Sequence, residues 1–154
     1  MRFTIFFILI SLAAKAQDCS VITKKVDKFD STVTLTSPFT NPCYFLKIEK
    51  SNDTVVILHL TSYGSTLNSG VKGVVILLAD GTKISRPGTK VKTDVHNSDS
   101  DWKYSAYLVL SSEEIEQLLK SSITDYKLYI YEASVNANTA ENYKQYLRCI
   151  KDMK

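Results

Sequence analysis

Two histidines, His59 and His96, carry the side chains in this sequence whose ordinary pKa suits a base near neutral pH. His59 alternates with Val55 and Ile57 in an apolar run. This spacing predicts a partly buried histidine that packs on one face of a strand rather than a catalytic base.

His96 stands in a polar segment that also carries three aspartates, Asp94, Asp99 and Asp101. Carboxylates and imidazoles bind divalent cations, so this segment predicts a metal site if it folds inward. The spacing does not fit an EF-hand loop, because a frame that starts directly after His96 places Trp102 where glycine is required. A solvated polar loop is the alternative.

Other catalytic signatures lack their necessary residues. The segment 64–70 is not a G-x-S-x-G elbow, and no glycine-rich loop has the spacing that cradles a phosphate or a dinucleotide. Glu113 and Glu114 are adjacent on a predicted helix, so they face different directions. The sequence predicts no cofactor and favours a protein that is not an enzyme.

Nine tyrosines and one tryptophan are the unusual feature of the composition. Tyr129 and Tyr131 alternate with Leu128 and Ile130, so they share a face if this segment is one extended strand. We expect the two tyrosines, with Trp102, to form a binding surface if the aliphatic residues face the core. Packing of the tyrosines beneath a helix is the alternative.

Two β-hairpins are the clearest local predictions. Apolar runs at 44–48 and 55–58 flank the polar break at 51–53, and a run at 74–79 ends at Asp80-Gly81, where glycine suits a tight turn. Residues 90–95 and 102–110 alternate like strands with one buried face, and an extended segment follows at 124–131. Before Cys43, the segments 20–29 and 32–36 are predicted as two further strands.

Two helices are predicted late in the chain. Ser111 and Glu114 have the spacing of a capping box, and the last helix is expected to begin at 138–141 and to present Tyr143, Leu147 and Ile150 on one side. Strands first and helices late favour an α+β domain, a mainly antiparallel β-sheet of hairpins with the two helices packed on it.

Residues 1–16 have the order of a secretory signal peptide. Arg2 precedes an apolar stretch of about ten residues, and Ala14-Lys15-Ala16 fits a small-x-small cleavage site. We expect residues 17–154 to form one globular domain that is secreted or periplasmic. No later segment has the roughly 20 apolar residues of a membrane-spanning helix.

The three cysteines, Cys19, Cys43 and Cys149, leave the disulfide pairing open. In an oxidising compartment two of them are expected to pair and one to be left over. The net charge of +3 includes Arg2 and Lys15 of the signal, so the remaining charge of +1 argues against nucleic acid as a partner.

Several short pieces of the chain resemble small exported proteins of unknown function from Gram-negative bacteria. They are Val26-Asp27-Lys28-Phe29, Gly70-Val71-Lys72-Gly73, Asp80-Gly81, Leu110-Ser111-Ser112-Glu113-Glu114-Ile115 and Cys149-Ile150. The resemblance implies a periplasmic or extracellular α+β domain and carries no functional residues.

The leading hypothesis is an exported, non-catalytic binding or structural module of the cell envelope, whose partner is an unidentified protein or small ligand. One alternative is a metal-assisted hydrolase that uses the His96 segment. The other is a carrier that holds a small apolar ligand between the sheet and the helices.

Overall fold

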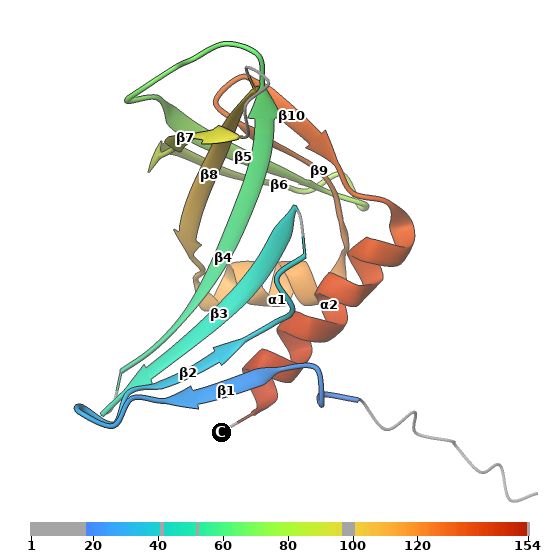
Figure 1. The fold of residues 1–154 in the computed structure, drawn as a ribbon. Helices are drawn as coiled ribbons and strands as arrows, with labels where there is room; N and C mark the ends of the chain where they lie inside the picture. Colours follow the sequence, from blue (N-terminus) through green and yellow to red (C-terminus); the bar gives the residue numbers. More distant parts are fainter. Residues whose placement is uncertain (1–17, 41, 52, 97–100, 154) are drawn as a thin grey trace, which may run out of the picture.

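The computed structural model describes residues 18–40, 42–51, 53–96 and 101–153. The predicted signal peptide at 1–16 lies outside these residues. All strand pairs of the described chain are antiparallel, and the two helices follow most of the strands, which confirms the α+β class (Figure 1).

The larger sheet has six strands in the order β1-β2-β3-β4-β8-β7. Its long centre is the β3–β4–β8 unit, in which β4 pairs with β3 on one side and β8 on the other. The strands are β1 (Thr23–Val26), β2 (Val33–Thr36), β3 (Cys43–Lys50), β4 (Asp53–Gly64), β7 (Lys92–His96) and β8 (Asp101–Val109).

The smaller sheet has four strands in the order β10-β9-β5-β6. They are β5 (Lys72–Leu78), β6 (Lys83–Lys90), β9 (Ile123–Leu128) and β10 (Tyr131–Ser134). Helix α1 (Ser112–Lys120) joins β8 to β9, and helix α2 (Ala137–Asp152) follows β10. The chain therefore crosses between the sheets several times instead of finishing one before it starts the other.

Both predicted hairpins are confirmed. Lys50 lies opposite Asp53 in the β3–β4 pair, and Ser51, directly after β3, adopts a φ of 55°. Gly81 has a φ of 83° in the turn between β5 and β6, a conformation that glycine adopts without strain. The expected strands before Cys43 also form, as the shorter β1 and β2.

The prediction of one extended strand through Tyr131 is wrong. Leu128 pairs with Tyr131, so Tyr129 and Ile130 make a two-residue turn between β9 and β10. Tyr129 has a φ of 59°, and its amide donates to the carbonyl of Gly73 at 2.8 Å. A contact with a distant strand thus stabilises a turn that lacks the usual glycine or asparagine, while the alternating pattern continues through it unbroken.

The predicted start of the first helix is confirmed, and the second helix starts one residue earlier than predicted. Ser111 and Glu114 form the predicted capping box, and Glu114 also accepts from Arg86 at 2.6 Å. Helix α2 begins at Ala137, not at 138, because the side chain of Asn136 accepts from the amide of Thr139 at 2.9 Å. Two asparagines two residues apart offer the same cap, and only the backbone path selects between them.

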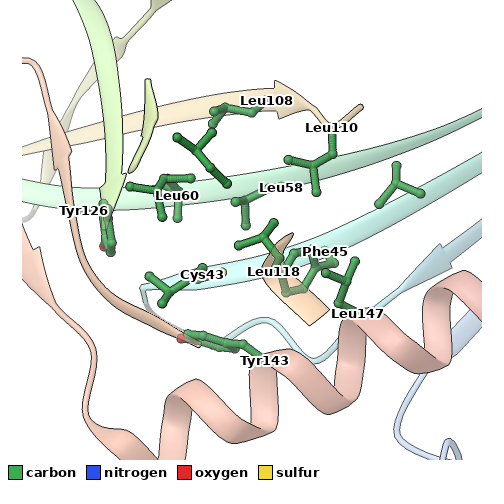
Figure 2. Close-up of a cluster of buried hydrophobic side chains, with 14 of the residues drawn as sticks. Cys43, Phe45, Leu58, Leu60, Leu108, Leu110, Leu118, Tyr126, Tyr143 and Leu147 are labelled. Atoms are coloured by element: carbon green, nitrogen blue, oxygen red, sulfur yellow. The ribbon is translucent and has the colours of Figure 1, made fainter. Parts of the chain in front are cut away.

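The core lies between the larger sheet and a layer made of the helices and the smaller sheet. Figure 2 shows side chains of β3 and β4, such as Phe45 and Leu58, facing Leu118 of α1 and Leu147 of α2. Phe45 and Leu58 are at most 1% exposed, and Leu147 is fully buried. Each such side chain contributes roughly 1.5–3 kcal/mol through burial.

One disulfide joins the two ends of the described chain. Cys19 pairs with Cys149 across 5.5 Å between their Cα atoms, which ties the segment before β1 to the last turn of α2. Cys43, at the start of β3, is the free cysteine and is 1% exposed. The structure thereby selects one of the three pairings that the sequence left open.

We predict that the folded, unreduced protein shows no thiol accessible to Ellman's reagent and that denaturation without reductant exposes one thiol. Burial raises the pKa of the Cys43 thiol, which keeps it protonated and out of reach of the reagent. A Cys43→Ala variant should show no thiol in either state. Two reactive thiols in the denatured Cys43→Ala protein would contradict the pairing.

Candidate ligand-binding surface

The outer face of the larger sheet, turned away from the core, is apolar along its centre. Leu46, Ile57 and Val109 are direct neighbours across β3, β4 and β8, and Ile48 lies beside Val55 in the adjacent row. Val55 is 36% exposed and Val109 is 60% exposed. Exposed aliphatic side chains that adjoin one another on a sheet are typical of a contact surface.

An aromatic row crosses the same face beside the aliphatic residues. Tyr44 of β3 and Tyr107 of β8 are the direct cross-strand neighbours of His59 in β4. The ring centroids lie 4.3 Å apart between Tyr44 and His59 and 4.5 Å apart between His59 and Tyr107. The imidazole is therefore held between two phenol rings, a stable arrangement for aromatic side chains.

The two tyrosines account for the burial of His59. Burial is the main cause that raises the pKa of Tyr44, and a hydrogen bond with Tyr107 is the second. The phenol groups of Tyr44 and Tyr107, which flank the imidazole, therefore also interact with each other. His59 is 6% exposed, although it lies on the outer face of the sheet, while Tyr107 is 54% exposed. The prediction of a partly buried packing histidine is confirmed.

Burial and, to a smaller extent, the nearby ammonium of Lys103 together lower the pKa of His59 to about 4. The ring is therefore neutral at pH 7. Its Nδ1 atom is buried and has no hydrogen-bond partner among the described residues. A buried polar atom without a partner costs stability, which marks this position as unusual for a purely structural residue.

A depression of about 210 Å3 opens beside the aromatic row. Phe39 forms one wall, with its ring 4.8 Å from that of Tyr44 in an edge-on arrangement. The residues that line the depression are Phe39, Thr40, Tyr44, His59, Thr61 and Lys103. The site thus combines aromatic walls, hydroxyl groups and one cation, and its lining contains no carboxylate.

This arrangement suits binding better than catalysis. A histidine that acts as a general base is normally oriented by a second polar group, and here aromatic rings occupy both sides of His59. Its low pKa also makes it a weak proton acceptor near neutral pH. Aromatic and aliphatic side chains with a few polar groups are, in contrast, the usual composition of a recognition surface.

The residues of the predicted tyrosine patch do not share one surface in the structure. Tyr129 lies in the β9–β10 turn and is 39% exposed. Tyr131 packs inward: its ring stacks on Tyr104 with centroids 4.3 Å apart, and its hydroxyl donates to the carbonyl of Thr66 at 3.0 Å. Trp102 is a partly buried side chain packed against the core.

Tyr131 therefore holds the 65–71 loop in place. Asn68 donates through its side chain to the Tyr131 hydroxyl at 2.8 Å and through its backbone amide to the Tyr104 hydroxyl at 3.0 Å. A role for Tyr129, Tyr131 and Trp102 in binding stays a prediction, and for Tyr131 the contacts favour the packing alternative.

The residues of the predicted metal site are only partly described. Asp94 forms a salt bridge with Lys92 at 3.1 Å, and the backbone of His96, the last residue of β7, pairs with that of Asp101, the first residue of β8. Asp99 lies outside the described residues. Within the described part of the chain, no three histidine, cysteine or acidic side chains gather as metal ligands.

Sequence reasoning identified His59 but missed its partners. Tyr44 follows Cys43 in a run without clear alternation, and Tyr107 lies in the predicted strand 102–110, on the face assigned to solvent. The register of the β3–β4 pair places Tyr44 beside His59. Tyr107 reaches His59 only through the pairing of β4 with β8, between which three other strands intervene in the sequence.

Comparisons with protein-family models, with curated proteins and with solved structures find no match to this chain.

We predict that Gly64→Ala destabilises the protein by about 1–3 kcal/mol. A Cβ atom at Gly64 would lie 2.1 Å from a ring atom of Tyr131, whose ring is held by Tyr104 and by hydrogen bonds to the 65–71 loop. Gly88→Ala is the matched control, because a Cβ there meets nothing within 4 Å. Equal unfolding midpoints in urea for the two variants would contradict this packing.

We predict that His59 contributes a loss of stability of about 2–3 kcal/mol as the pH falls from 6.5 to 4. The unfolded chain binds a proton near pH 6.5 and the folded chain only near pH 4, so acid favours unfolding in that window. Urea unfolding at pH 7 and pH 4.5 should show that His59→Phe loses less stability than the natural chain. A parallel loss in both proteins would refute the assignment.

Proposed function

We propose that this protein is an exported, non-catalytic binding module of the cell envelope and that it contacts its partner through the outer face of the larger sheet. One observation carries the proposal. The inner face of this sheet is covered by the helices and the second sheet, while Val55, Tyr107 and Val109 on the other face are 36–60% exposed. An uncovered apolar face is costly in water unless a partner uses it.

Export is supported by covalent and sequence features together. The Cys19–Cys149 disulfide is stable in an oxidising compartment, and residues 1–16 have the pattern of a secretory signal. Within the described residues, no helix has the length and apolar character needed to cross a membrane.

The two alternatives receive less support from the geometry. For a metal-assisted hydrolase, Asp94 is already paired with Lys92. For a carrier, the cavity between the sheet and the helices, bordered by Phe45, Leu118 and Leu147, measures only about 10 Å3. An apolar ligand of ordinary size needs a pocket of roughly 300 Å3 or more.

The proposal is tested by comparing two tyrosines on different surfaces. We predict that Tyr107→Ser reduces recovery of a partner from an envelope extract of the source organism about tenfold, because a central aromatic contact is lost. The measurement is quantitative mass spectrometry of proteins and glycans retained on the immobilised chain.

Tyr129→Ser is the matched control, since Tyr129 is also exposed but lies in the β9–β10 turn. Both variants should stay folded and unfold cooperatively in urea, although Tyr107→Ser also loses the ring contact with His59. Loss of the retained component with Tyr129→Ser alone, or identical retention by all three proteins, would refute the proposed surface.

A further inference from the structure

A second and larger depression lies where the chain passes from one sheet to the other. It measures about 750 Å3 and is formed by the start of β5, the end of β6, the start of β7 and the middle of β8. Its lining residues are Gly70, Val71, Lys72, Thr89, Lys90, Val91, Lys92, Ser105 and Tyr107. We call it the lysine groove.

The lysine groove concentrates positive charge. Lys72 and Lys90 are direct cross-strand partners in the β5–β6 pair. Lys90 and Lys92 flank Val91, which is 4% exposed, so both lysines project away from the core. The lining includes no acidic residue, and like charges placed opposite each other on a sheet are destabilising.

The neighbouring carboxylates relieve only part of this repulsion. Lys92 pairs with Asp94 at 3.1 Å. In the described part of the chain, neither Lys72 nor Lys90 belongs to any of the salt bridges. Two ammonium groups therefore stay available for an external anion, and a recess focuses their field on it.

Tyr107 borders the groove and presents an aromatic surface, since 54% of it is exposed. A ligand held by the lysines can thus pack its less polar parts against this ring. The volume lies in the range of pockets that enclose ligands of drug size or short segments of a polymer, and is larger than one small anion needs.

We infer that the lysine groove binds an anionic polysaccharide, with acidic groups on Lys72 and Lys90 and a sugar ring against Tyr107. An acidic polysaccharide carries the repeated charge that the paired lysines match, and Tyr107 offers one aromatic ring for a sugar. Single-stranded nucleic acid fits less well, because its binding sites stack successive bases on several aromatic side chains and the groove has only Tyr107.

This inference goes beyond the proposed function and uses different residues, apart from Tyr107, which borders both surfaces. Failure of the groove to bind a polysaccharide would leave the outer-face contact intact. If Tyr107→Ser retained its partner as well as the natural chain does, the outer-face proposal would fail, but binding of a polysaccharide by Lys72 and Lys90 would still be decided by the titration below.

The test is isothermal titration of the unreduced protein, without its predicted signal peptide, at low salt. Polygalacturonate and dextran sulfate supply carboxylate and sulfate groups, neutral dextran is the uncharged control, and oligo-dT represents nucleic acid. We expect one or both acidic polysaccharides to bind, dextran to show no heat, and the affinity to fall as salt is raised.

The decisive comparison is between two double variants with the same change in charge. Lys72→Gln with Lys90→Gln should weaken polysaccharide binding about tenfold or more. Lys25→Gln with Lys28→Gln, at and beside the opposite edge strand β1, should weaken it less than twofold.

Three outcomes would overturn the inference. Equal losses in the two double variants would show that net charge, not the groove, attracts the polymer. Tighter binding of oligo-dT that depends on Lys72 and Lys90 would assign the groove to nucleic acid. No binding of either acidic polysaccharide at low salt would remove the site.

Discussion

The structure depends on burying one face, and only one, of the β3–β4–β8 unit. Successive side chains of a strand point to opposite faces, so packing Phe45, Leu58 and Leu108 against the helices and the second sheet commits their neighbours to the other side. The aromatic row and the exposed aliphatic residues are therefore consequences of the same register that builds the core. A slip by one residue would exchange the two faces.

The covalent and polar contacts hold the layer that covers the inner face. The Cys19–Cys149 disulfide joins the segment before β1 to α2, and Lys47 donates to the backbone of Met153 at 2.6 Å on the same side of the sheet. Tyr126 of β9 donates its hydroxyl to the carbonyl of Thr61 and links the sheets. These contacts are far apart in sequence, so the covering layer becomes stable only when the whole chain folds.

Two surfaces result, and they differ in chemistry. The outer face is aromatic and aliphatic, with a neutral imidazole at its centre, and suits a partner with apolar groups. The lysine groove is cationic and adjoins it through Tyr107. Their proximity means that one extended partner, or two partners at once, could reach both without a change in the fold.

The sequence alone determined the features set by neighbouring residues: the α+β class, both early hairpins, the capping box at Ser111 and the burial of His59. The predictions failed or stayed open where a contact between residues far apart in the sequence determines the local structure. The Tyr129–Ile130 turn depends on Gly73, the α2 cap on the path of the backbone, and the cysteine pairing on where α2 ends. Tyr44 and Tyr107 join His59 only through pairing of β3, β4 and β8. Alternation specifies which side chains share a strand face, but tertiary packing decides which face is buried and which strands become neighbours.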